Sequence, residues 1–211
     1  MQQHFIINIG RQVGSGGKRI GELLSRRLGI ALYDKELINL AAERSGFCPE
    51  CFERADEQEQ KGMLAALVGY FRTPLMGNYS LQNPLSNDSL FKIQSDVIRQ
   101  LAEEQSCIFI GRCADYILRD HPRTVNIFLS ADMPERIRRM AERMNCNDEE
   151  AAEHIERIDA QRARYYNYYT TRNWGEAASY DLCINTSLLG DEATAELILN
   201  FAAQKLNMTL K

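Results

Sequence analysis

The sequence contains no long hydrophobic run, since no stretch approaches the roughly 20 apolar residues that a membrane-spanning helix needs. Residues 1–4 are uncharged at their start, and the apolar run that follows them is only as long as a β-strand. The pattern of a secretory signal peptide is therefore missing. From these two absences we expect a cytoplasmic protein that does not contact a membrane.

Paired metal-ligand motifs are also scarce. One C-x-x-C pair, Cys48 and Cys51, stands without the second C-x-x-C or the H-x₃₋₅-H segment that a zinc site needs. The pair follows a helical pattern, whereas a thioredoxin-like motif opens a helix after a strand. The remaining cysteines are scattered, as expected for reduced thiols in a reducing compartment. The sequence therefore predicts neither a zinc site nor a redox site here, and no metal-ligating side chains.

Lysine is scarce, although the chain is not short of positive charge. Of the 25 basic residues 19 are arginines, and residues 136–172 hold eight arginines and no lysine. The formal net charge is −4, which argues against general binding to nucleic acid. The planar guanidinium group suits bidentate recognition of phosphate, so arginine bias in an acidic protein indicates a local anion site.

A glycine-dense turn lies between an apolar run, residues 6–9, and an amphipathic helical segment. Gly14, Gly16 and Gly17 let successive backbone N–H groups converge on one anion without interference from a Cβ atom. The helix that follows directs its positive dipole end to the same point. Lys18 would reach the outer phosphates of a bound nucleotide. The pattern predicts a phosphate cradle; a merely structural glycine turn is the alternative.

The turn departs from both common phosphate-binding motifs. In G-x-x-x-x-G-K-S/T the first glycine falls on Gln12, and Arg19 replaces the final hydroxyl. The usual side-chain ligand for Mg²⁺ is therefore missing. The dinucleotide motif G-x-G-x-x-G also fails, because its third glycine falls on Arg19, which excludes a dehydrogenase reading.

Short apolar strands alternate with helical segments along the chain. This alternation predicts an α/β fold, a doubly wound five-stranded parallel sheet with helices on both faces. Ligands of such sheets bind at the carboxyl ends of the strands. The predicted strands are residues 6–9, 29–34, 107–112, 125–130 and 180–186. Among the helices, we expect a long one from residue 147 to about residue 169 and a closing one from Asp191.

Length favours a single domain over residues 1–211, with an insertion. The insertion covers roughly residues 35–90 and includes an apolar segment, 63–71, and a long loop, 73–87. A loop this long in a compact domain is usually a lid, a binding loop or an interface. Two readings are open: a helical lobe that closes over a substrate, or a packed helix with a surface loop.

The chain resembles the nucleoside monophosphate kinases, and most closely the cytidylate kinase-like family of P-loop kinases. The order of features along almost the whole chain carries the resemblance. These features are the glycine loop, Tyr33-Asp34, Gly111-Arg112, residues 130–136, Asp159 with Arg162, and Tyr180-Asp181.

The resemblance implies ATP-dependent phosphoryl transfer to a nucleoside monophosphate, with CMP or dCMP favoured. It implies ATP and Mg²⁺ as cofactors, a small-molecule nucleotide as partner, a helical acceptor lobe, an arginine-rich lid at 145–175, and allows a homodimer. By this resemblance Gly14, Ser15, Gly16, Gly17, Lys18 and Arg19 would hold donor phosphates, with Arg139 and Arg143 nearer the donor base. Asp34, Arg112 and Asp159 would bind the acceptor, while Lys18, Arg157, Arg162 and Arg164 would act on the transferred phosphoryl group.

The chain differs from cytidylate kinases at several acceptor positions. Ile110 and Cys113 replace the acidic residues that flank the Gly-Arg pair, Lys35 replaces a serine, and Leu40 replaces an arginine. The acceptor therefore stays open, and so does a kinase of another small molecule. A nucleotide-binding sensor or interaction module with a degenerate kinase site is the second class of function.

Two of the candidate roles have plain structural alternatives. On an ideal helix Arg157 and Arg164 share a face, while Arg162 lies about 140° from Arg157, so the three converge only if the helix ends or bends near residue 163. An arginine-rich helix with solvent-exposed acidic partners would show the same composition. Asp34 would equally suit the N-cap of a helix beginning at Lys35.

Overall fold

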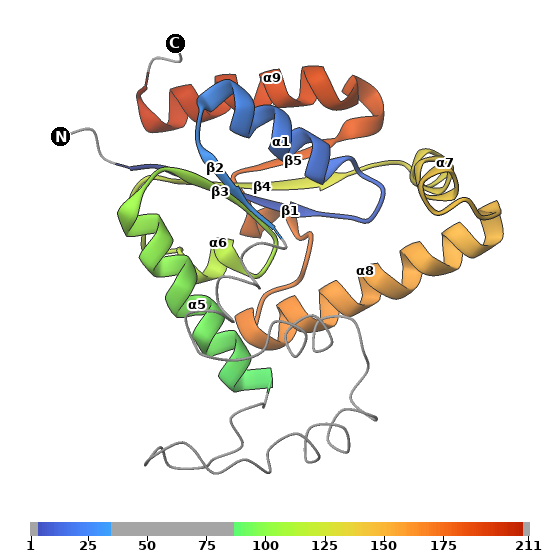
Figure 1. The fold of residues 1–211 in the computed structure, drawn as a ribbon, viewed down its shortest axis with the longest axis horizontal. Helices are drawn as coiled ribbons and strands as arrows, with labels where there is room; N and C mark the ends of the chain where they lie inside the picture. Colours follow the sequence, from blue (N-terminus) through green and yellow to red (C-terminus); the bar gives the residue numbers. More distant parts are fainter. Residues whose placement is uncertain (1–3, 35–86, 209–211) are drawn as a thin grey trace, which may run out of the picture. The chain divides into compact units, whose positions relative to one another are not determined.

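The computed structural model describes residues 4–34 and 87–208. A five-stranded sheet lies at its centre, with the strand order β2-β3-β1-β4-β5 and every neighbouring pair parallel (Figure 1). The predicted five-stranded parallel sheet is confirmed. Its strands are β1 (Ile6–Arg11), β2 (Ala31–Tyr33), β3 (Cys107–Ile110), β4 (Thr124–Ser130) and β5 (Leu182–Asn185).

Helices cover both faces of this sheet, as the doubly wound prediction requires. Helices α1 and α9 lie side by side on one face, and α6 and α8 lie on the other (Figure 1). Helix α7 connects β4 to α8 beyond the carboxyl ends of the strands (Figure 1). The described helices are α1 (Gly17–Leu28), α5 (Asn87–Glu104), α6 (Ala114–Ile117), α7 (Met133–Met144), α8 (Asp148–Thr170), α9 (Thr186–Leu206) and a 3₁₀ turn (Ala177–Ser179).

Burial on both faces explains why the strands read as apolar runs. Ile7 and Ile9 of β1 are almost fully buried, and they form one core with Ile20 and Leu24 of α1. Each such side chain contributes roughly 1.5–3 kcal/mol to stability when it is removed from water. This core fixes the start of α1 against the carboxyl end of β1, where the glycine turn lies.

The beginning of the last helix differs from the prediction, which placed it at Asp191. Helix α9 begins at Thr186, because the Asn185 side chain accepts a hydrogen bond from the Ser187 amide at 3.0 Å and caps the helix. Its regular backbone is interrupted at Gly190 (φ 73°, ψ 176°), so that Asp191 opens a second helical segment. This break places Asp191 beside the glycine turn.

The chain divides into two compact units, residues 1–34 with 98–211 and residues 35–97. The predicted acceptor lobe at 35–90 lies almost entirely outside the described residues, as do the 63–71 segment, the 73–87 loop and the Cys48–Cys51 pair. Among residues 4–34 and 87–208, no helix combines the length and the apolar character needed to cross a membrane.

Candidate functional site

The glycine turn connects β1 to α1 and needs glycine at two of its positions. Gly14 (φ 77°) and Gly16 (φ 80°) adopt the left-handed conformation, and a Cβ on Gly14 would lie 2.9 Å from the backbone oxygen of Arg136. The Gln12 carbonyl closes the turn by accepting from the Ser15 amide at 3.4 Å and the Ser15 hydroxyl at 2.9 Å. The predicted loop therefore forms with the backbone geometry that its glycines indicated.

Free backbone amides line the start of α1. The first helical hydrogen bond joins the Ile20 amide to the Gly16 carbonyl at 3.0 Å. The amides of Gly17, Lys18 and Arg19 precede that bond, and helix geometry leaves such amides without an intrahelical acceptor. In the described part of the chain no other group accepts from them. Together with the α1 dipole they form an anion cradle.

Lys18 supplies a free cation at this cradle. Its side chain is exposed, and it forms no ion pair with any carboxylate of the residues that the structure describes. A polyphosphate is the kind of ligand that such a set of donors binds, because amides and ammonium all donate to anionic oxygens. The amides of residues 17–19 and the Lys18 ammonium therefore suit the phosphates of ATP.

Asp159 of α8 holds the glycine turn in place. Its Oδ1 accepts from the Val13 amide at 2.9 Å, and its Oδ2 forms an ion pair with the buried Arg136 of α7. Arg136 in turn donates from Nε to the Val13 carbonyl at 2.7 Å. Burial raises the pKa of Asp159, and the Val13 amide and Arg136 oppose that shift. In this structure both oxygens of the predicted acceptor-binding carboxylate anchor the loop.

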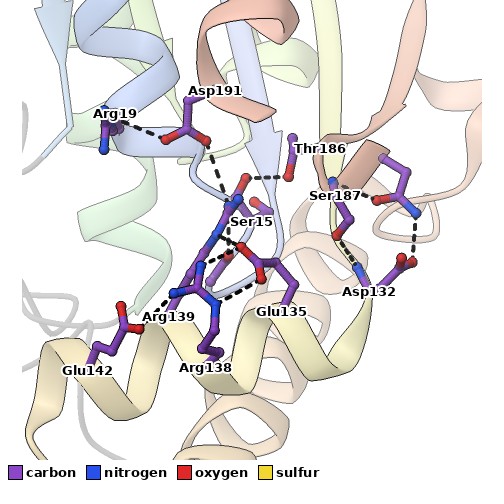
Figure 2. Close-up of polar contacts among 12 residues, drawn as sticks. Ser15, Arg19, Asp132, Glu135, Arg138, Arg139, Glu142, Thr186, Ser187 and Asp191 are labelled. Atoms are coloured by element: carbon purple, nitrogen blue, oxygen red, sulfur yellow. Dashed lines mark hydrogen bonds and ion pairs between the residues drawn. The ribbon is translucent and has the colours of Figure 1, made fainter. Parts of the chain in front are cut away.

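Ser15 is also engaged inside the loop. It is fully buried, and its carbonyl accepts from the Thr186 hydroxyl at 2.9 Å (Figure 2). The Gln12 side chain adds a contact to the Ala131 amide at 3.3 Å. The residues that follow β4 and β5 therefore also hold the loop in place.

Arg139 of α7 lies beside the cradle. Its Nε donates to Glu135 at 2.8 Å, and its Nη1 approaches the Gly14 carbonyl at 3.3 Å (Figure 2). Hydrogen bonds from Arg138 and Arg139 lower the pKa of Glu135 to about 2, so this carboxylate stays ionised at neutral pH. The structure thus brings Arg139 to the cradle, whereas Arg143 is exposed one turn further along α7.

Arg11 lies at the end of β1, next to the ends of β2 and β3. Its Nη2 lies 3.4 Å from Asp34 Oδ1, and a Cβ on Gly111 would collide with its guanidinium group. Arg112 follows in the left-handed conformation (φ 59°), which Gly111 (φ 72°) also adopts. The structure thus places the predicted Asp34 and Arg112 near Arg11. Arg11 was not among the site residues predicted from the sequence.

Helix α8 carries the three predicted lid arginines, and it brings only one of them to the cradle. Arg162 donates from Nη1 to the Arg11 carbonyl at 3.2 Å. The helix runs unbroken to Thr170, so the bend near residue 163 that convergence requires is not present. Arg157 lies 3.2 Å from His154 instead, and Arg164 is exposed.

Three arginines lie close enough to His154 of α8 to affect its charge. Burial lowers the pKa of His154, and the charges of Arg157, Arg143 and Arg162 lower it further. Arg143 and Arg157 are therefore close enough to influence a residue of α8.

Asp191 is a second residue that sequence reasoning missed. Its carboxylate lies between Arg19 Nε at 3.3 Å and Arg139 Nη1 at 3.7 Å (Figure 2). No local pattern indicates this contact, because Asp191 is distant from the loop in sequence.

The described residues contain no group of three or more His, Cys, Asp or Glu side chains that would hold a metal ion by itself. At nucleotide sites Mg²⁺ usually takes most of its ligands from phosphates and waters, with one or two carboxylates.

Comparison with known proteins adds a family. The cytidylate kinase-like family matches residues 6–188. A cytidylate kinase from Methanosarcina barkeri (strain Fusaro / DSM 804) is 24% identical over 182 residues, which cover 85% of this chain and 86% of that protein.

Solved structures share the fold. An uncharacterized protein from Eubacterium ventriosum ATCC 27560 superposes with a TM-score of 0.71 at 24% identity, covering 94% of this chain and 98% of that chain. The shikimate kinase from Bacteroides thetaiotaomicron has a TM-score of 0.54 at 14% identity, with 97% and 99% covered. A shikimate kinase from Acinetobacter baumannii, solved in complex with shikimate, gives 0.53 at 14% identity, with 96% and 94% covered.

Proposed function

Since this chain belongs to the cytidylate kinase-like family, we propose that it transfers the γ-phosphoryl group of ATP to a nucleoside monophosphate, with CMP or dCMP first among the acceptors. The observation that carries the proposal is the cradle at the start of α1. Its amides at residues 17–19 and the exposed Lys18 are free to bind an anion at the carboxyl edge of a parallel sheet.

The proposed reaction breaks the bond between the γ-phosphorus and the oxygen that bridges to the β-phosphate. A new bond joins that phosphorus to a phosphate oxygen of the acceptor. Phosphoryl transfer requires little covalent chemistry from protein, but it requires alignment and positive charge around the moving group. A divalent cation bound with the polyphosphate supplies part of that charge.

In the proposal, residues of this chain supply the remaining positive charge and the alignment. The cradle and Lys18 hold and neutralise the donor phosphates. Arg162 lies at the edge between donor and acceptor, because it contacts the Arg11 carbonyl at the end of β1. Asp159 positions the loop through the Val13 amide and does not bind the acceptor in this scheme.

The acceptor phosphate is assigned to the opposite edge of the cradle. Arg112 follows β3, the strand next to β1, and Arg11 lies over the adjoining Gly111. The base of the acceptor is assigned to the inserted lobe at 35–90.

A kinase of another small molecule is the second candidate, and one observation favours it. Ile110 and Cys113 are buried where cytidylate kinases carry acidic residues, and burial raises the pKa of the Cys113 thiol, which keeps it neutral. The site therefore lacks two charges that would recognise an acceptor, while the fold is shared with shikimate kinases.

A coupled ADP-release screen tests the proposal. Wild-type protein is given ATP, Mg²⁺ and each nucleoside monophosphate in turn, together with shikimate as a non-nucleotide acceptor. We expect acceptor-dependent ADP release that is fastest with CMP or dCMP and absent in Lys18→Ala. A higher kcat/KM for shikimate would change the substrate class. ATP binding without ADP release on any acceptor would favour the sensor.

A further inference from the structure

Asp191 lies against the anion cradle although it belongs to the last helix. The break of α9 at Gly190 turns the chain so that Asp191 opens the next helical segment. Its Oδ1 would lie only 2.5 Å from a Cβ on Gly16, the residue before α1. A negatively charged group is therefore placed directly beside amides that are arranged to bind negative charge.

This carboxylate is incompletely satisfied. Oδ1 is buried and has no hydrogen-bond partner among the described residues. Arg19 and Arg139 approach it at 3.3 Å and 3.7 Å, as Figure 2 shows, but neither forms a hydrogen bond with it. Arg19 is also 70% exposed, so water screens its attraction. A buried carboxylate oxygen without a donor is unfavourable for the folded protein, so a role outside folding becomes attractive.

The same two arginines are candidates for holding the donor phosphates. Arg139 also contacts the Gly14 carbonyl, and Arg19 extends from the first turn of α1. In the structure Arg19 pairs with Asp191, and Arg139 is shared between Asp191 and Glu135. A polyphosphate that enters the cradle must compete with this carboxylate for both guanidinium groups, and it is repelled by the same carboxylate at close range.

We infer that Asp191 is a built-in competitor of the donor polyphosphate, which lowers the affinity of the cradle for ATP and for ADP. The inference rests on the proposed function, because it assigns the cradle to a polyphosphate. The inference predicts that removing the Asp191 carboxylate strengthens the binding of ATP, whereas removing a residue of a binding site usually weakens it.

Isothermal titration of three proteins tests the inference. The proteins are the wild type, Asp191→Asn, and Glu192→Gln as the matched control. Glu192 is the next residue of α9, but its carboxylate is 62% exposed and pairs with Arg27 near the far end of α1. Each protein is titrated with ATP, with inorganic tripolyphosphate and with adenosine, at low and at high salt.

We expect Asp191→Asn to lower the Kd for ATP and for tripolyphosphate by about three- to tenfold at low salt, with a smaller gain at high salt. Adenosine carries no phosphate, so its affinity should not change. Glu192→Gln should behave as the wild type. If Asp191→Asn does not fold, Asp191→Ser removes the same charge and retains a residue favoured at helix starts.

Unchanged or weaker ATP binding by a folded Asp191→Asn protein would overturn the inference while leaving the donor site in place. Weaker adenosine binding would overturn it as well, because it would show that Asp191 contacts the nucleoside. If none of the three proteins binds ATP or tripolyphosphate, the donor site itself fails and the inference fails with it.

Discussion

Lys18 is the residue on which donor binding depends most directly. Its ammonium is exposed at the start of α1 and has no carboxylate partner in the described part of the chain. We expect Lys18→Ala to weaken ATP binding by about 1.5–3 kcal/mol, the range of a hydrogen bond to a charged group. It should also abolish transfer, because the same ammonium neutralises the transferred phosphoryl group in the proposed reaction. The thermal unfolding midpoint should stay unchanged, because no core contact is lost. Titration and melting curves measure both, and an unchanged ATP affinity would remove the cradle from the account.

Arg112 is expected to serve the acceptor and not the donor. It follows β3 at the carboxyl edge, beside the strand that leads into the cradle. Arg112→Ala should raise the acceptor KM and lower kcat while ATP affinity stays nearly the same. Steady-state kinetics with each substrate varied separates these effects. A collapse of ATP binding would instead assign this arginine to the donor side.

Arg162 should act mainly on the transition state, where negative charge is shared between donor and acceptor oxygens. Its Nη1 lies 3.2 Å from the Arg11 carbonyl, at the edge of the cradle. Arg162→Ala should reduce kcat by roughly 10²–10⁴, or about 3–5 kcal/mol, with little change in ATP affinity. Arg162→Lys should recover little, because an ammonium cannot make the same two-pronged contact. An equally active Arg162→Ala would contradict the lid assignment.

At the level of single residues, the sequence indicates the glycine turn itself but not the side chains that surround it. Gly14, Gly16 and Lys18 carry a local signal, because a glycine turn directly before a helix is the usual form of a phosphate-binding loop. Arg11 and Asp191 carry no local signal. Their contacts depend on where β3 and α9 return to the loop, and only the tertiary structure shows that.

Among the elements, the turn between β1 and α1 depends on Gly14. Gly14→Ala introduces a left-handed alanine at φ 77° and places its Cβ 2.9 Å from the Arg136 backbone oxygen. Strain of this kind costs about 1–3 kcal/mol, and here the backbone clash adds to it. Urea unfolding should show the loss, together with weaker ATP binding.

Gly29→Ala is the matched control for that variant. Gly29 also has a positive φ of 64°, but no atom lies within 4 Å of its added Cβ. It should lose less stability and retain ATP affinity. Equal losses in both variants would show that the left-handed backbone alone, and not the clash at the cradle, determines the effect.

Sequence patterns located most elements because each carries its own signals. Helix α8 was expected from residue 147 to about 169 and spans Asp148–Thr170, with a capping box between Asn147 and Glu150. The early start of α9 was missed because its cap, Asn185, lies in a stretch that reads as strand. The expected convergence of the lid arginines needed a bend that the unbroken α8 does not have.

For the whole molecule, the buried Asp115 predicts how stability responds to pH. It is 8% exposed and accepts from the Tyr166 hydroxyl at 2.6 Å. Burial is the largest influence on its pKa and raises it, although Tyr166 and Arg172 oppose the shift. A carboxyl whose pKa is raised by folding stabilises the protein at low pH, and this contribution is lost as pH rises through the folded-state pKa.

Asp115→Asn removes this ionisation and retains an acceptor for Tyr166. Its stability relative to wild type should therefore increase as the pH rises from acidic values, near the ordinary pKa of an aspartate, toward neutral. Thermal melting of both proteins across this range measures the difference, in which the pH dependence of all other groups cancels. A variant that is less stable by the same amount at every pH would contradict the raised pKa.

The fold and the family were predictable from the sequence, whereas the acceptor was not. Alternating apolar runs and helical patterns determine a parallel sheet, and the strand ends bring the polar residues to one edge. In the proposed function, acceptor choice depends on the inserted lobe and on single positions such as Ile110 and Cys113, where one side chain changes the local charge. Such positions carry no periodic signal.

The central claim is that the cradle supports phosphoryl transfer. The most direct test follows label from ATP radiolabelled at the γ-phosphate, with Mg²⁺ and each candidate acceptor, in wild type and Lys18→Ala. The account predicts a labelled nucleoside diphosphate from the wild type, most from CMP or dCMP, and none above background from Lys18→Ala. Label released only as inorganic phosphate with every acceptor, or equal transfer by Lys18→Ala, would contradict it.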